Sequence, residues 1–176
     1  MNRRKKRTLF ICEAAIIAAL YVALTWLSTV LGLSSGAIQC RFSEALCILP
    51  YFTASAIPGL GIGCLISNIM ACGNPFDIAF GTLATVLGAL GAYALRKLPV
   101  GKWLAAVPTV VSNTLIIPFV LRFTYTWGVE NSIYYYMLTV GIGEVISVGL
   151  FGMALLFALE PHKKRIFYAG NGKKSL

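Results

Sequence analysis

The stretch "FSEALCILPYFTASAIPGLGIGCLISNIMAC", residues 42–72, decides how often this chain crosses a membrane. A spanning helix needs about 20 apolar residues, so the stretch is too long for one span and short for two. Its middle, "TASAIPG" (53–59), contains a proline, which disfavours helical geometry in the residue before it. The stretch therefore forms either two short or tilted helices that meet near residues 54–58, or one long kinked helix.

The composition indicates a membrane protein with no separate soluble domain. Of the 176 residues, 58% are hydrophobic and 12% are charged, whereas a soluble domain carries about 25% charged residues. This difference argues against a soluble helical protein with an unusually apolar core. Further spanning helices are expected at residues 9–31, 78–95, 103–121 and 133–159.

Basic residues settle the number of crossings. They gather in three blocks, at residues 3–7, 96–102 and 163–174, and Lys and Arg are enriched in cytoplasmic loops. Two basic termini on one side require an even number of spans, so residues 42–72 should form two helices. We therefore predict an all-α membrane protein, a six-transmembrane-helix bundle with both termini cytoplasmic. Its parts are a basic arm (1–8), a membrane domain (9–160) and a basic tail (161–176).

Polar side chains gather in the outer half of this predicted bundle. Ionisable residues are costly in lipid and by default indicate a functional site, here a polar pocket open to the outside. There are structural alternatives: Arg41 and Glu44 could pair at i, i+3, Glu144 could accept a bond from a neighbouring helix, and Asp77 could cap a helix. The candidate binding residues are Arg41, Glu44, Asn68, Asp77, Asn113 and Glu144.

Two other groups have simpler expected roles. Glu13 alone falls in the inner half, where pairing with the basic arm would explain it. Most outer aromatics should form an interfacial belt, although one or two could stack on a planar ligand. The outer aromatics are Phe76, Phe123, Tyr125, Trp127, Tyr134, Tyr135 and Tyr136.

The sequence lacks the residues that several classes of chemistry require. The sequence has no G-x-x-x-x-G-K-[ST] motif for nucleotide phosphates. Its one histidine, His162, lies in the tail, and its five cysteines show no C-x-x-C spacing. We therefore expect no enzyme, no cofactor and no metal site, and any uphill transport should be powered by another chain.

The first helix carries small residues at i, i+4 spacing, which lets helices approach closely in lipid. Such stripes either pack inside the bundle or dock a partner. The residues are Ala14, Ala15, Ala18 and Ala19.

Three blocks resemble a known family: "QCRFSEALCILPYF" (39–52), "AIPGLGIGCLISNI" (56–69) and "NPFDIAFGTLATVLGA" (74–89). They are similar to the QueT family of queuosine-precursor transporters, which are substrate-binding (S) components of energy-coupling factor (ECF) transporters. The resemblance extends over about residues 8–160.

This resemblance implies a six-helix protein of the bacterial cell membrane that captures queuine or a pre-queuosine 7-deazaguanine base near its outer face. Its partners would be a transmembrane coupling protein and two ABC-type ATPases, with docking through an A-x-x-x-A surface that Ala14/Ala18 and Ala15/Ala19 match. Arg41, Glu44, Asn68 and Asp77 fall in the matching blocks, whereas Asn113 and Glu144 are candidates because of their predicted depth and helix position. The alternatives are an S component for another vitamin-like heterocycle and a stand-alone facilitator.

Overall fold

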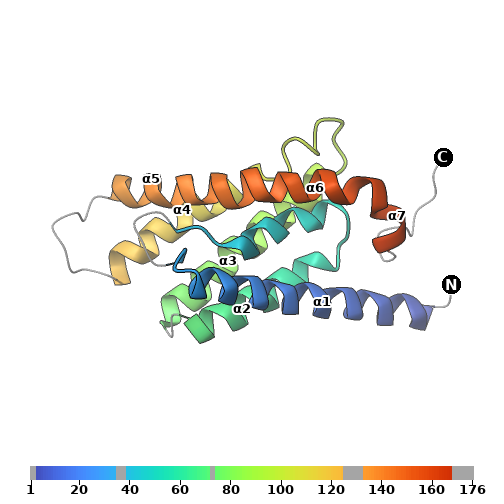
Figure 1. The fold of residues 1–176 in the computed structure, drawn as a ribbon, viewed down its shortest axis with the longest axis horizontal. Coiled ribbons are helices and arrows are strands. Elements are labelled where there is room, and N and C mark those ends of the chain that lie inside the picture. Colours follow the sequence, from blue (N-terminus) through green and yellow to red (C-terminus); the bar gives the residue numbers. More distant parts are fainter. Residues whose placement is uncertain (1–2, 35–38, 72–73, 125–132, 168–176) are drawn as a thin grey trace.

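The computed structural model describes residues 3–34, 39–71, 74–124 and 133–167, and this part of the chain contains helices and no strand (Figure 1). In chain order the elements are α1 (Arg3–Val30), the 3₁₀ helix η1 (Phe42–Tyr51), α2 (Ala56–Ala71), α3 (Pro75–Leu95), α4 (Val107–Thr124), α5 (Ile133–Glu144), the π-helix η2 (Val145–Gly152), α6 (Met153–Leu159), η3 (Glu160–His162) and α7 (Lys163–Ile166).

Residues 42–72 form two helices, as predicted. η1 ends at Tyr51 and α2 begins at Ala56, with Pro58 in the first turn of α2, where a missing N–H breaks no helical bond. The 3₁₀ form of η1 was not expected. A 3₁₀ helix rises about 2.0 Å per residue, against about 1.5 Å in an α-helix, so η1 reaches further than an α-helix of its length.

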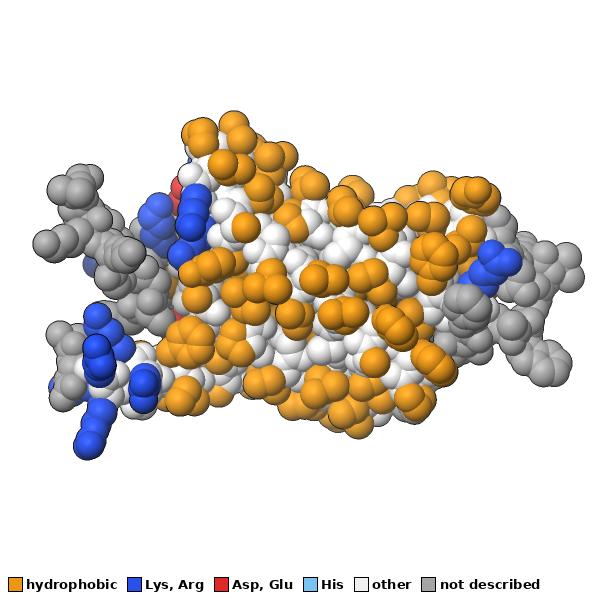
Figure 2. Space-filling view, turned by 180° about the vertical axis from the view of Figure 1, so that it is seen from behind, with side chains coloured by type: hydrophobic (Ala, Val, Ile, Leu, Met, Phe, Trp, Pro, Cys, Tyr) orange, Lys and Arg blue, Asp and Glu red, His pale blue; other side chains and the backbone are white. Residues whose placement is uncertain are grey.

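The segments agree with a protein that spans a membrane. Three helical segments are long and apolar enough to cross, α1, α3 and the continuous run Ile133–His162, and three shorter apolar ones are η1, α2 and Val107–Arg122. Figure 2 shows hydrophobic side chains over the sides of the bundle and Lys and Arg at its ends. Lipid chains, rather than water, suit such a surface.

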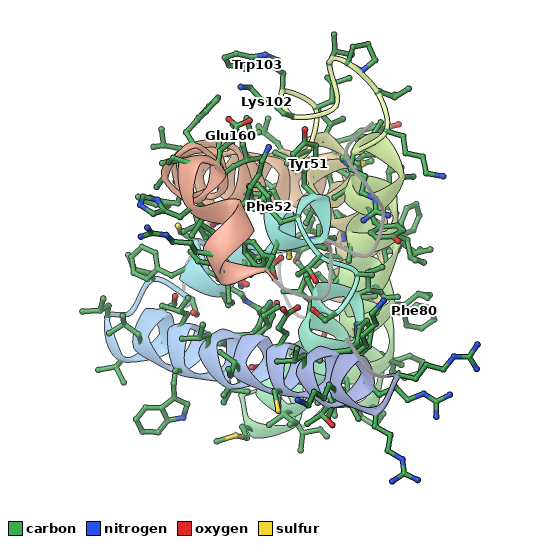
Figure 3. All side chains as sticks on the ribbon, turned by 90° about the vertical axis from the view of Figure 1, so that its right-hand side faces the viewer. Tyr51, Phe52, Phe80, Lys102, Trp103 and Glu160 are labelled. Carbon is green, nitrogen blue, oxygen red and sulfur yellow. The ribbon has the colours of Figure 1, made fainter. Side chains whose placement is uncertain are left out.

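The start of α1 and α7 lie at the same end of the bundle (Figure 1). At this end Lys102 binds Glu160 at 3.1 Å, with Trp103 beside them (Figure 3), and so ties the α3–α4 connection to η3. This placement fits an even number of crossings. The cytoplasmic orientation of the termini and the division into arm, membrane domain and tail stay predictions.

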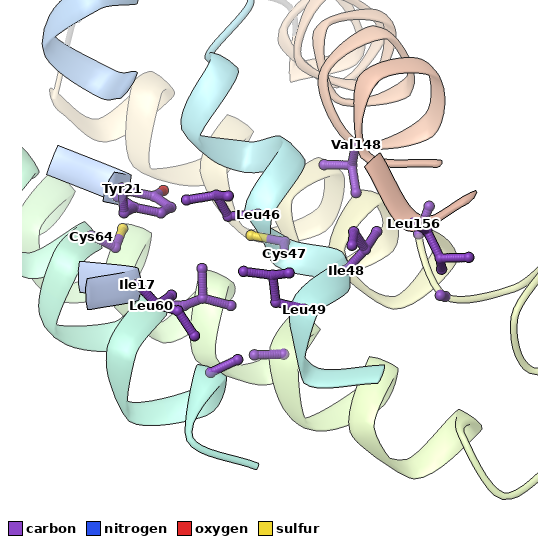
Figure 4. Packing of buried hydrophobic residues seen from close by; sticks show 14 of the residues in the cluster. Ile17, Tyr21, Leu46, Cys47, Ile48, Leu49, Leu60, Cys64, Val148 and Leu156 are labelled. Carbon is purple, nitrogen blue, oxygen red and sulfur yellow. The ribbon is translucent and has the colours of Figure 1, made fainter. Parts of the chain in front are cut away.

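The core surrounds η1, which runs through the middle of the bundle (Figure 4). Cys47 and Ile48 of η1 have no exposed surface and pack with Tyr21 of α1 and Leu60 of α2. The contact of η1 with η2 brings Val148, which is also fully buried, into the same cluster.

α1 and α2 meet through small residues. A Cβ on Gly59 would lie 2.7 Å from the carbonyl oxygen of Ala14, and one on Gly63 would lie 3.0 Å from that of Ala18. Ala14 and Ala18 are accordingly buried, each 8% exposed, whereas Ala15 and Ala19 are exposed. Ala14 and Ala18 therefore pack inside the bundle, and Ala15 and Ala19 are the residues for which docking of a partner stays a prediction.

Candidate ligand-binding cavity

A cavity of about 570 Å³ opens between α1, η1 and helices α2 to α5. All six candidate binding residues line it, so the structure brings together side chains that are more than 100 positions apart in the sequence. They are Arg41, Glu44, Asn68, Asp77, Asn113 and Glu144. Their role in binding remains a prediction.

Glu44 is held by the protein itself. It lies in the first turn of η1 and is 4% exposed. The hydroxyl of Tyr21 donates to its Oε1 at 2.5 Å, and the thiol of Cys47 donates to its Oε2 at 3.2 Å. Both carboxylate oxygens therefore already have partners from α1 and η1.

Glu144 differs from Glu44 in having an unsatisfied oxygen. It ends α5 directly before the π-helix η2, and π-helical turns are frequent at functional sites. The amide of Asn113 on α4 hydrogen-bonds to its carboxylate. Glu144 therefore also accepts a bond from a neighbouring helix, which was the structural alternative. Its Oε2 is nevertheless buried and accepts no hydrogen bond from the described residues. A buried oxygen without a partner is rare in proteins and here faces a candidate ligand cavity.

Asn68 and Asp77 form a second polar region, at the α2–α3 wall. Nδ2 of Asn68 lies 3.4 Å from both Sγ of Cys64 and the backbone oxygen of Asp77. An asparagine amide has two N–H donors, enough for both contacts. The second contact joins α2 to the start of α3.

The capping alternative for Asp77 is wrong. Asn74 is the N-cap of α3, because its side-chain oxygen accepts from the backbone N–H of Phe76 at 2.9 Å, and Pro75 follows it. Asp77 lies within the first turn instead. There the helix macrodipole stabilises a negative charge.

Residues 39–42 hold Arg41 at the cavity. The backbone N–H of Arg41 donates to Ser147 of η2 at 3.1 Å, and that of Phe42 donates to Ser28 of α1 at 2.8 Å. A side chain at Gly143 would collide with the backbone of Gln39, so this segment lies directly against α5. The segment therefore connects the first and last long helices across the cavity.

Sequence reasoning missed the hydroxyl groups of the cavity wall. Thr25, Thr85 and Thr139 line the cavity, as do Tyr135 and Tyr136, whereas Tyr134 points outward and is 79% exposed. From the sequence, the run of tyrosines indicated only that one or two of them could stack on a ligand. Single threonines within apolar helices did not indicate a cavity. Tyr125 and Trp127 lie outside the described residues, and so does the side chain of Phe123.

Glu13 belongs to another part of the molecule. Its Oε2 accepts from the hydroxyls of Thr53 at 3.0 Å and Ser55 at 2.7 Å, at the connection between η1 and α2. These two bonds fix that connection to α1. They give Glu13 a structural role beyond the expected pairing with the basic arm.

An apolar exterior around a cavity of carboxylate, amide and hydroxyl groups is typical of a helical membrane protein with an internal polar site. Residues 11–161 match the family model described as QueT transporter, and the chain belongs to this family. This confirms the resemblance seen in the sequence blocks.

A curated relative and the solved structures complete the comparison. The chain is 38% identical over 84 residues to the "Queuosine precursor transporter QueT" of Lactococcus lactis subsp. cremoris (strain MG1363). The aligned part covers 48% of this chain and 49% of that protein, so the match spans about half the length of each. No solved structure matches the chain.

Proposed function

We propose that this protein is the substrate-binding subunit of an ECF-type ABC transporter in a bacterial cell membrane and takes up a queuosine precursor, either queuine or a pre-queuosine 7-deazaguanine base. Membership of the QueT transporter family and the name of the lactococcal relative support the ligand class. The observation that carries the proposal is the buried Oε2 of Glu144, which lacks a partner among the described residues beside a cavity of ligand size.

The cavity suits a deazaguanine in size and chemistry. Sites for small molecules enclose about 300–1,000 Å³, and the volume here is about 570 Å³. A guanine-like edge presents two donors, N1–H and the 2-amino group. Glu144 offers an acceptor for this pair, and Asn113 holds its carboxylate in place.

Tyr135 and Tyr136 supply aromatic surface in the same cavity, with ring centroids 6.0 Å apart. Stacking of a base on an aromatic ring contributes about 1–3 kcal/mol in nucleic-acid systems. A planar bicyclic ligand would gain from stacking on these tyrosines.

Uptake against a gradient needs an energy source outside this chain. The sequence has no P-loop, so ATP hydrolysis would occur in two separate ABC-type ATPases linked through a transmembrane coupling protein. The exposed alanines Ala15 and Ala19 on α1 provide the docking surface in this proposal.

Calorimetric titration of the purified protein tests the ligand class. The panel contains queuine, 7-aminomethyl-7-deazaguanine, guanine, riboflavin and biotin, together with a deazaguanine analogue that lacks the 2-amino group. We expect saturable binding of the deazaguanines and an analogue affinity lower by about 10–100-fold, because a buried acceptor loses its donor. Binding of a vitamin but no deazaguanine would instead support an S component for another heterocycle.

Co-purification and flux measurements test the subunit role. ATPases that co-purify with the tagged protein support an ECF assembly. Solute flux through liposomes that contain this protein alone would support the stand-alone facilitator and contradict the proposal.

A further inference from the structure

The connection between α3 and α4, residues 96–106, exposes several large apolar side chains. They are 40–63% exposed and belong to a series of turns rather than to a spanning helix. The four residues lie outside the lining of the ligand cavity. Apolar side chains gathered in this way mark a site of contact with a membrane or with another protein. The residues are Leu98, Val100, Trp103 and Leu104.

This connection is fixed to the rest of the bundle. Ala105 and Ala106 are buried in the core cluster, and Lys102 binds Glu160 of η3 at 3.1 Å. Backbone N–H groups of the connection donate to oxygens three residues earlier, in successive turns. The exposed apolar side chains are therefore carried by an ordered segment.

The connection lies at the level of the headgroups rather than inside the hydrocarbon. Figures 1 and 3 show it projecting from the side of the bundle opposite α1, and it follows directly after the spanning helix α3. A backbone of turns leaves polar groups that hydrocarbon cannot satisfy. Trp103 nevertheless contacts Phe157 of α6, with ring centroids 5.1 Å apart, so the apolar surface of the connection is continuous with that of a spanning segment.

Basic and aromatic groups accompany this apolar surface. Lys97 is exposed, and the guanidinium of Arg96 lies 3.7 Å from the ring centroid of Tyr93. No acidic residue occurs among residues 96–106. Tryptophan and tyrosine favour the membrane–water interface, and Lys and Arg close to it attract anionic lipids. The combination therefore fits a lipid surface better than it fits water.

We infer that residues 96–106 form an interfacial anchor, which lies in the headgroup layer and binds anionic phospholipids. Trp103 supplies apolar contact with the upper part of the acyl chains, and Lys97 supplies the charge that attracts the headgroup phosphate. The occupant is lipid rather than a partner protein, because the apolar surface continues onto the exposed Phe157 of a spanning segment. The inference does not depend on which molecule the cavity holds.

Fluorescence quenching by brominated lipids tests the inference. The full chain, with Trp103 as its one tryptophan after Trp26→Phe and Trp127→Phe, is reconstituted in vesicles that contain brominated phosphatidylcholine or brominated phosphatidylglycerol. We expect both lipids to quench Trp103, and phosphatidylglycerol to bind beside it at least about 5-fold more tightly, since each cation near a membrane surface contributes about that factor. Lys97→Gln should lower this preference by about 5-fold, and high salt should lower it as well.

Lys5→Gln is the matched control. Lys5 is also an exposed cation, but it belongs to α1, on the opposite side of the bundle (Figure 3). This substitution should leave the lipid preference at Trp103 unchanged. A loss of preference as large as that of Lys97→Gln would show a general effect of net charge and would overturn a site on residues 96–106.

Three other results would overturn the inference. Quenching of Trp103 by aqueous iodide but not by brominated lipid would place the connection in water. Equal binding of the two lipids, or a preference unchanged by Lys97→Gln, would exclude recognition of anionic headgroups. Lipid quenching that disappears when the protein is assembled with its co-purifying subunits would show that a partner protein covers this surface. None of these results bears on deazaguanine binding, which tests the proposed function separately.

Discussion

Glu13 and Glu144 are both acidic residues of long apolar helical segments, but their surroundings differ. Glu13 accepts hydrogen bonds from Thr53 and Ser55, where α1 meets the connection between η1 and α2. Glu144 keeps an oxygen that none of the described residues satisfies, beside a cavity of about 570 Å³. A carboxylate bonded from within holds the fold together, whereas one left with an unmet acceptor indicates a ligand.

The packing around the two residues differs in the same way. On the Glu13 side, glycines of α2 let the backbone of α1 approach at Gly59 and Gly63. On the Glu144 side, threonines, tyrosines and amides face each other across open space. We call these regions the closed half and the cavity half. Changes in the closed half should alter stability, and changes in the cavity half should alter binding.

The largest effect is expected from Gly63→Ala in the closed half. The new Cβ would lie 2.7 Å from Cβ of Tyr21 and 3.0 Å from the backbone oxygen of Ala18, and neither atom can rotate away. We expect the free energy of unfolding to fall by about 3 kcal/mol, the upper end for overpacking. Thermal unfolding of the purified protein measures it. The control is Gly149→Ala, whose Cβ would meet only Val145 at 3.7 Å. Equal stability of the two variants would contradict the close crossing.

The next effect is on binding, in Glu144→Gln. The substitution keeps the shape but can place an N–H donor against the donors of the ligand. We expect the affinity for a deazaguanine to fall by about 1.5–3 kcal/mol, or about 10–100-fold, with little change in unfolding temperature. Titration calorimetry and thermal unfolding of one preparation separate the two quantities. Wild-type affinity in both Glu144→Gln and Glu44→Gln would rule out carboxylate recognition of the base.

A smaller effect, on stability rather than on binding, is expected from Glu13→Gln. The glutamine oxygen can still accept from Thr53 or Ser55, but the bonds lose their charge. We expect the free energy of unfolding to fall by about 1 kcal/mol and ligand affinity to remain at the wild-type value. If affinity fell while stability held, the division into a closed half and a cavity half would be wrong.

Much of the fold could be predicted because its signals are local. Pro58 and the basic blocks together predicted the break between η1 and α2 and an even number of crossings. The 3₁₀ geometry of η1, whose residues 43–50 are buried, could not be predicted. The sequence of η1 alone gives no reason to prefer it.

The site could be predicted in part because charge is costly in lipid wherever it lies. This cost identified the six polar candidates, which share one cavity. It could not show that Tyr21 and Cys47 occupy both oxygens of Glu44. Nor could it show that Asn74, rather than Asp77, caps α3, because both are good capping residues and only the position of the first turn decides.

The smallest effect on the isolated protein is expected at the outer face of α1. Ala15 and Ala19 are exposed there, whereas Ala14 and Ala18 contact α2. The sequence could not separate the two stripes, since both have i, i+4 spacing and only the rotation of α1 against Gly59 and Gly63 distinguishes them. We expect Ala15→Leu to leave stability and ligand affinity at wild-type values, because a leucine in lipid displaces nothing.

In the assembled transporter the same leucine should separate α1 from the coupling protein and abolish ATP-driven uptake, since a large side chain at a close crossing forfeits packing along the contact. Ala18→Leu is the matched control, and it should lower stability by about 1–3 kcal/mol through overpacking inside the bundle. Uptake by reconstituted vesicles, compared with calorimetry on the isolated variants, distinguishes the two stripes. If Ala15→Leu supports wild-type uptake, the outer face of α1 is a lipid-facing surface and the coupling protein docks elsewhere.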